Sequence, residues 1–233
     1  MTLWEQWELV NYIANKDYEG NVIEPERFKQ LVKLANMDLF RRRMGLPEDY
    51  KIGMPLSREY YEANMQLAEE TKFLKVYNPT QAVTNGVVSY PANYFRFDDM
   101  RYGYQRNVDG SSVVIWKPVE MLFENEYSDR AGNWTKRPTT KNPVCVLRSG
   151  GIYVYPNTIP QVEFAYVRYP NDPVFAYTVQ NGYIQPDTAN MVEYEWPSSL
   201  HINLTIYILG YIGINLREKD LQNYVQLHKV QGE

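Results

Sequence analysis

The sequence predicts an α+β fold with a helical N-terminal part, an antiparallel β-sheet or small sandwich in the middle, and long C-terminal helices. Apolar residues recur at helical spacing over residues 1–75 and again over 197–233. Between them, over residues 76–196, short alternating runs of apolar and polar residues are separated by turn dipeptides. We therefore expect a helical N-terminal region, a β-domain and a C-terminal helical region within these bounds.

The N-terminal region is expected to contain three helices. One face of the first carries Leu3, Trp7, Val10 and Ala14. The second helix begins at Pro25, a residue that suits the first helical position, and ends in Arg41, Arg42 and Arg43, whose charges suit a helix C-terminus. The third follows Ser57 and continues to about residue 71.

The middle region shows the pattern of a β-domain. Its turn dipeptides are Asn85-Gly86, Asp109-Gly110, Gly150-Gly151 and Asn181-Gly182. The alternating runs predict strands over residues 86–90, 100–106, 112–117, 143–148, 152–155 and 162–169. Val119, Leu122 and Phe123 favour a short helix within residues 118–127. A long polar loop carrying Trp134 is expected over residues 128–142.

The C-terminal region is expected to contain two helices. The first has an apolar stripe of Ile202, Ile206, Leu209, Gly213 and Leu216, and its opposite side carries Leu204, Ile208 and Ile212. Two apolar sides predict a helix that is buried on both. The second, an amphipathic helix, is expected over residues 217–230 and includes Tyr224.

Composition excludes several classes of function. The net charge of −4 and the pI near 5.4 provide no general electrostatic attraction for nucleic acid. Cys145 is the only cysteine, so no internal disulfide and no multi-cysteine metal site can form. The N-terminal residues lack the pattern of a signal peptide, and the uncharged stretch 196–216 is too polar for a membrane helix. We expect no metal, no cofactor and no membrane partner.

Few residues are equipped for catalysis. Cys145 lies between Val144 and Val146, which indicates a buried apolar position in a strand. His201 is expected to be a hydrogen-bonded core or interface residue, and His228 to face solvent. We therefore expect no catalytic residue and no enzymatic activity.

Carboxylate pairs leave an alternative open. Asp98 with Asp99, and Glu124 with Glu126, are the acids that could support hydrolysis of a glycan, which needs two carboxylates at a suitable separation. Adjacent residues of an extended strand point to opposite faces, so Asp98 and Asp99 are expected to be poor partners. Solvated acids at strand or helix ends are the favoured interpretation.

The aromatic content indicates contact surfaces. The chain has 21 Tyr, 5 Trp and 8 Phe, and aromatic residues make up 15% of it. Tyrosine is enriched at protein interfaces, although many of these rings could instead line the β-domain core. Arg41, Arg42 and Arg43 are either a helix end or a docking patch for an acidic protein or a nucleic-acid backbone. The candidate interface residues are Trp4, Trp7, Arg41, Arg42, Arg43, Trp134 and Tyr224.

The order of segments resembles a known class of viral proteins. The motifs are Pro91-x-x-Tyr94-x-Arg96, the strand pair closed by Gly150-Gly151, and Tyr166-x-Arg168-x-Pro170 followed by Pro173. Over about residues 85–230, this order is similar to the head–tail connector, adaptor or neck-ring proteins of short-tailed bacteriophages, above all those of crAss-like phages.

The resemblance implies a structural virion protein in the neck or tail region, assembled in the host cytoplasm. Copies would form a ring, commonly of twelve subunits, that joins the portal to neighbouring ring or tail proteins. The ring would continue the channel for DNA ejection, through which DNA passes without specific binding. A carbohydrate-binding or glycan-hydrolysing β-domain is the alternative, and a phage tail or baseplate protein of another symmetry is a third possibility.

Overall fold

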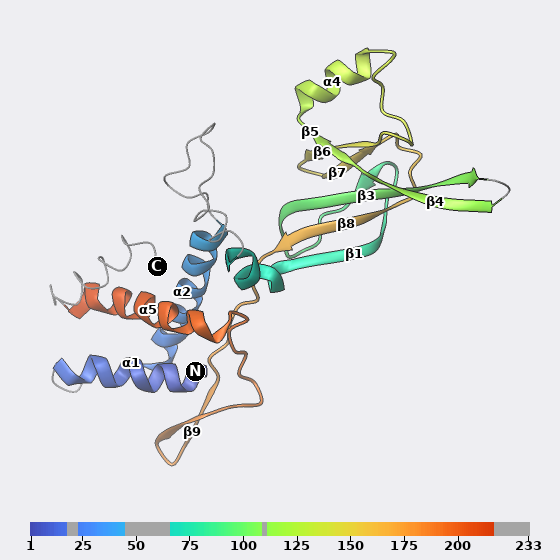
Figure 1. The fold of residues 1–233 in the computed structure, drawn as a ribbon. Coiled ribbons are helices and arrows are strands. Elements are labelled where there is room, and N and C mark those ends of the chain that lie inside the picture. Colours follow the sequence, from blue (N-terminus) through green and yellow to red (C-terminus); the bar gives the residue numbers. More distant parts are fainter. Residues whose placement is uncertain (18–22, 45–65, 109–110, 217–233) are drawn as a thin grey trace. The chain divides into compact units, whose positions relative to one another are not determined.

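The computed structural model describes residues 1–17, 23–44, 66–108 and 111–216, and it is α+β as the sequence predicts (Figure 1). The chain divides into two compact units. One, the β-unit, is Leu74–Tyr169; the other, the helical unit, combines Met1–Phe73 with Pro170–Glu233. Residues 170–196, which the sequence pattern placed in the β-domain, therefore group with the helices.

In its described residues, the helical unit has three long helices. They are α1 (Leu3–Asp17), α2 (Pro25–Met44) and α5 (His201–Leu216), and α5 packs against both of the others. Residues 66–71 are helical and lead into the 3₁₀ turn η1 (Lys72–Leu74), while a second 3₁₀ turn, η2 (Ser198–Leu200), precedes α5. The unit also holds a hairpin of β9 (Tyr177–Gln180) and β10 (Tyr183–Pro186).

Helical spacing predicted the inward face of α1 but not that of α5. Leu3, Val10 and Ala14 are buried as expected. α5 was expected to be buried on both sides; the side with Leu204 and Ile208 is fully buried, whereas Ile202 on the other side is 67% exposed. Both sides of α5 are apolar, so periodicity could not rank them. No helix within the described ranges has the length and apolar character needed to cross a membrane.

Two of the predicted long helices fall wholly or mostly outside the described residues. The expected amphipathic helix over 217–230, with Tyr224, lies there, as does most of the expected helix after Ser57. Of the long C-terminal helices, the structure therefore shows α5.

The β-unit is a sandwich of two four-stranded sheets. The first has the order β1-β8-β3-β4 and the second β2-β7-β6-β5. The strands are β1 (Lys75–Ala82), β2 (Val87–Val88), β3 (Tyr94–Val108), β4 (Ser111–Pro118), β5 (Glu120–Leu122), β6 (Val144–Arg148), β7 (Gly151–Tyr155) and β8 (Gln161–Arg168). The pairs are antiparallel except β5 with β6, which is parallel.

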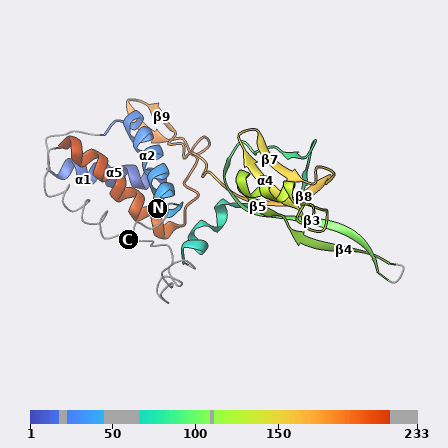
Figure 2. The ribbon, with the colours of Figure 1, turned by 90° about the horizontal axis from the view of Figure 1, so that it is seen from above.

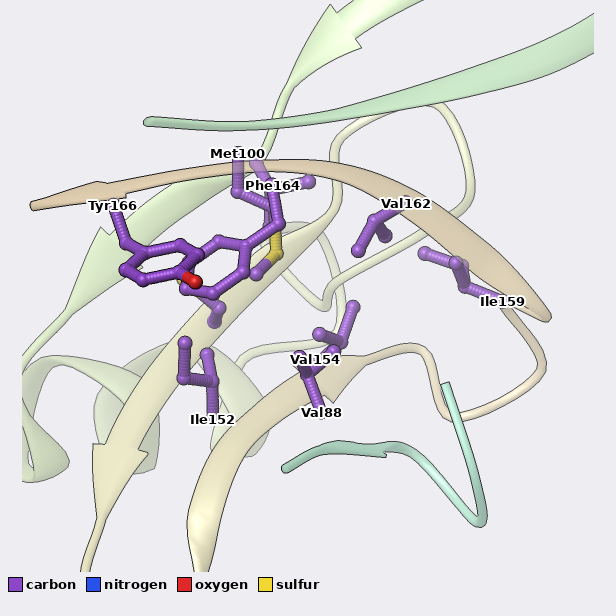
Figure 3. Close-up of a cluster of buried hydrophobic side chains, with 10 residues drawn as sticks. Val88, Met100, Ile152, Val154, Ile159, Val162, Phe164 and Tyr166 are labelled. Atoms are coloured by element: carbon purple, nitrogen blue, oxygen red, sulfur yellow. The ribbon is translucent and has the colours of Figure 1, made fainter. Parts of the chain in front are cut away.

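Side chains from both sheets meet in one core. Figure 3 shows Phe164 and Met100 of the first sheet facing Ile152 and Val154 of the second. All four are at most 1% exposed. β8 lies where the sequence predicted a strand over residues 162–169, and its Val162, Phe164 and Tyr166 are buried in this core.

Two segments differ from the expected elements. The short helix expected over residues 118–127 is instead strand β5 followed by helix α4 (Glu124–Gly132). Glu120, Met121 and Leu122 pair with residues 144–146, a partner that local periodicity cannot reveal. The sequence pattern also missed β1, which contains Pro79; β1 is an edge strand, and its register shifts between Asn78 and Gln81, where a proline is tolerated.

Cys145 lies in the sandwich core with no exposed surface, as expected of its apolar neighbours. Burial raises the pKa of its thiol to about 12, from an ordinary value of 9.0. Because the thiolate is the reactive form, a thiol reagent should label Cys145 in the folded chain at least about a thousandfold more slowly than in the denatured chain. Stopped-flow labelling measures this ratio, and rapid labelling of the folded chain would contradict the core position.

Candidate assembly interface

Strands β3 and β4 form an arm that extends beyond the first sheet. β3 pairs with β8 from Tyr94 to Arg101, and its remaining residues pair with β4 alone. β4, at the edge of the sheet, pairs only with β3. We define the β3–β4 arm as residues 102–108 and 111–117, a two-stranded ribbon that spans roughly 20 Å. Figures 1 and 2 both show it reaching past the end of β8.

Apolar side chains occupy both faces of the β3–β4 arm. On one face Trp116 lies opposite Gly103, and its ring and Val114 cover the space that a side chain at Gly103 would fill. Trp116 is 51% exposed and Val114 46%. On the other face Ile115 is half-buried and Val113 is 46% exposed.

The composition of the arm indicates a partner. A two-stranded hairpin alone is marginally stable in water, and a strand with one unpaired edge offers hydrogen-bonding groups to another chain. The apolar side chains exposed on both faces would also lower the free energy if a partner protein buried them. The β3–β4 arm is therefore the described surface that best fits a protein contact.

The helical unit carries a second exposed hairpin. Asn181 and Gly182 have positive φ angles of 52° and 81°, which fits the two-residue turn that the sequence predicted between strands. Val179 is 63% exposed and Tyr183 74%. The hydroxyl of Tyr177 donates to Glu26 of α2 at 3.1 Å, which attaches the base of the hairpin and raises the pKa of that phenol.

Trp4 and Trp7, both expected at an interface, are half-buried within the helical unit. Their ring centroids lie 4.8 Å apart, and each is within 6 Å of Phe175 (5.9 and 5.8 Å). Phe28 of α2 meets Phe175 edge-on at 5.0 Å. These rings join α1, α2 and the segment after residue 170, so Trp4 and Trp7 contribute to packing inside the unit.

The three arginines close the C-terminal end of α2. The guanidinium of Arg42 lies 5.4 Å from the ring centroid of Tyr207, and Arg43 forms a 3.4 Å ion pair with Glu70. Arg41 is exposed. The structure thus joins two of the three to neighbouring elements, while Tyr224, the other C-terminal candidate, lies outside the described residues.

The carboxylates considered for hydrolysis each contact a neighbouring group. Asp98 lies 3.4 Å from Lys75, and Asp99 accepts a 2.9 Å bond from Arg101. Asp98 and Asp99 are both among the residues that line one hollow of about 320 Å³, and the register of β3 against β8 shifts between Phe97 and Asp99.

Glu124 and Glu126 hold helix α4. Arg148 donates two hydrogen bonds to Glu124, at 2.5 and 3.0 Å, and this bonding keeps the pKa of that carboxyl below its ordinary value. Glu126 accepts a hydrogen bond from the backbone N–H of Phe123 at 2.9 Å, which closes the first turn of the helix. The two acids thus fasten α4 to the second sheet and fix its beginning.

His201 has the structural setting that the sequence predicted. Its two ring nitrogens lie 2.8 Å from the carbonyl oxygen of Met1 and 3.0 Å from that of Trp196. The histidine therefore links the N-terminus to the segment before α5. His228 lies outside the described residues. Among the described residues, no three His, Cys, Asp or Glu side chains are grouped closely enough to hold a metal ion.

The sequence pattern placed Trp116 in a strand but did not single out the β3–β4 arm. The sequence did contain an indication of this arm: Val113, Val114, Ile115 and Trp116 are four consecutive apolar residues. A strand of an antiparallel hairpin usually has one polar face, so four apolar residues in a row place apolar side chains on both faces.

No model of a known protein family matches this chain, and no curated protein matches it.

Proposed function

We propose that the chain is a structural virion protein whose copies assemble into a ring in the portal–tail connector of a tailed phage. The β3–β4 arm is the observation that carries the proposal. A ring needs two different, complementary patches on every subunit, so that each copy contacts the next in the same way. The arm, with Trp116 exposed, supplies one such patch, and the exposed hairpin β9–β10 is a candidate for the other.

The segments that carry the resemblance to connector proteins support the proposal. Tyr94 pairs with Arg168, and Phe97 pairs with Tyr166, on the adjacent strands β3 and β8. The hydroxyl of Tyr166 donates to Asn93 at 3.1 Å, and the backbone N–H of Tyr169 donates to the carbonyl of Asn93 at 2.9 Å. The two motifs thus form one structural feature at the end of the sheet opposite the arm.

The charge of the chain is compatible with a DNA channel. The net charge of −4 gives copies of this chain a weakly repulsive average surface toward DNA. A ring of such copies would let DNA pass during ejection without holding it. The portal and the neighbouring ring or tail proteins are the other partners that this role requires.

Charged residues on the arm should break the ring. Replacing both Val114 and Trp116 by lysine should leave the chain monomeric, because a buried tryptophan at an interface commonly contributes about 2 kcal/mol or more. Light-scattering mass and electron microscopy of the purified protein measure the change. The unaltered chain is expected to form closed rings at high protein concentration.

Met121→Lys provides the matched control, since Met121 is a 43% exposed apolar residue of the same unit outside the arm. This variant should assemble like the unaltered chain, and both variants should keep the unaltered thermal unfolding curve. An unaltered chain that stays monomeric at every concentration would refute the proposed ring.

A further inference from the structure

A polar groove lies between helix α4, the loop after it and the beginning of β5. Its volume is about 950 Å³, at the upper end of the range of small-ligand pockets. The lining is mostly charged and amide-bearing, with Asn133 and Asn142 among its donors. Of the two proposed assembly hairpins, the β3–β4 arm contributes Lys117, at its base, to one side of this groove.

The groove is basic although the chain is acidic. Five cations and two carboxylates line it: Lys117, Arg130, Lys136, Arg137, Lys141, Glu120 and Asp129. Arg130 is neutralised by Glu120, to which it donates two hydrogen bonds at 2.8 and 2.7 Å. Lys117, Lys136 and Lys141 have no ion pair with any described residue. Residues 130–142 contain no carboxylate at all, so the positive charge is local and concentrated.

An exposed aromatic ring stands at the rim of the groove. Trp134 is 81% exposed, and both of its chain neighbours, Asn133 and Thr135, line the groove. The guanidinium of Arg137 lies 5.6 Å from the ring centroid of Trp134, and its Nε donates to the carbonyl of Ala131 at 3.1 Å. Arg137, which lines the groove, thus contacts the indole of Trp134, and most of that ring stays open to solvent.

We propose that this groove binds single-stranded nucleic acid without sequence preference. Lys117, Lys136 and Lys141 would neutralise phosphates, and Trp134 would stack against a base. Cations that follow a backbone, combined with an aromatic ring that accepts any base, are the two components of such sites. The inference does not depend on ring assembly, because the groove is complete within one chain.

The shape and chemistry of the groove favour this ligand over others. A concave pocket of this volume admits a single strand, whereas duplex DNA, about 20 Å across, would contact only its rim. An acidic peptide would gain little binding free energy from apolar contacts here, because few apolar side chains line the groove. An acidic polysaccharide could use the same cations and stack its sugar rings on Trp134, so the experiment below includes one as a competing ligand.

The test is the binding of a fluorescently labelled oligothymidylate to the full chain at low salt, followed by anisotropy. Three neutralised phosphates predict that the logarithm of the binding constant falls with the logarithm of salt concentration with a slope of about −2. Lys136→Gln with Lys141→Gln should weaken binding and reduce the magnitude of that slope by about 1.4. Trp134→Ala should weaken binding about fivefold to a hundredfold.

Matched variants distinguish binding in the groove from nonspecific attraction to positive charge elsewhere on the surface. Lys33→Gln with Lys72→Gln removes two exposed lysines elsewhere on the chain, and Phe123→Ala removes another exposed aromatic ring; neither should change binding. Failure of the oligothymidylate to bind, or unchanged binding by the groove variants, would overturn the proposal. Binding of polygalacturonate or polyglutamate as tight as that of the oligothymidylate would overturn it in favour of an acidic polymer of another class.

Discussion

Replacing Phe164 by alanine should lower the free energy of unfolding of the β-unit by about 3–5 kcal/mol, the usual cost of removing a buried phenylalanine ring. Phe164 is completely buried and lies on β8, which has a strand on each side. Its ring centroid is 5.2 Å from that of Tyr166 and 6.3 Å from that of Tyr94. Removing the ring would leave a cavity and would remove its contacts with side chains of both sheets and with the rings of Tyr94 and Tyr166.

The measurement should report on the β-unit alone, because two compact units need not unfold together. Cys145 provides that probe: it is the only cysteine of the chain and lies in the same core as Phe164. Pulsed thiol labelling across a urea gradient should therefore give an unfolding midpoint for the β-unit.

Two variants calibrate the loss. Phe164→Leu keeps most of the apolar volume and should be clearly less destabilising than the alanine variant. Phe123→Ala removes the same ring from a site that is 69% exposed and should shift the midpoint little. If Phe164→Ala shifted the midpoint no more than Phe123→Ala, the assignment of Phe164 to the centre of the core would be incorrect.

The sequence predicts those elements whose determinants are local. Alternation identified β8 and the strand around Cys145, and the dipeptide Asn181-Gly182 occupies a turn with the positive φ angles that such residues tolerate. Helical spacing identified α1 and α2. In each case the signal lies within a few residues, where side-chain direction and backbone conformation are coupled.

What could not be predicted depends on partners distant in the chain. Val119 and Leu122 are apolar enough for a helix, but pairing with residues 144–146 makes their segment a strand. The sequence of β3 does not reveal that its register against β8 shifts between Phe97 and Asp99, because the register depends on the partner strand. The basic groove likewise forms only when Lys117 of β4 meets the loop after α4, so overall composition concealed it.

The exposure of the β3–β4 arm also depends on a partner that is distant in the chain. Trp116 was expected in a strand, and four consecutive apolar residues indicated two apolar faces. β8 stops pairing with β3 at Arg101, so beyond that residue the arm continues as two strands without a third beside them. Because that limit is set by the length of another strand, the exposure of the β3–β4 arm follows from topology rather than from local pattern.

Replacing Gly151 by alanine should destabilise the β-unit by about 2–4 kcal/mol, through backbone strain and overpacking together. Gly151 begins β7 with a φ of +143°, a conformation that residues with a side chain rarely adopt. A Cβ there would lie 2.7 Å from the carbonyl oxygen of Val88 and 2.7 Å from a methyl group of Val87. Since the oxygen belongs to the backbone of β2, relief would require β2 to move away from β7.

Gly150 supplies a control one residue away in the same turn. A Cβ at Gly150 would meet only the hydroxyl of Tyr153, at 3.5 Å, which is an ordinary contact. Gly150→Ala should therefore change the unfolding free energy by less than about 0.5 kcal/mol, as expected of an uncrowded surface position. Urea unfolding followed through Cys145 labelling compares the two proteins under identical conditions. Equal midpoints would mean that β2 does not approach Gly151 closely, and the placement of Val88 in the sandwich core would then have to be abandoned.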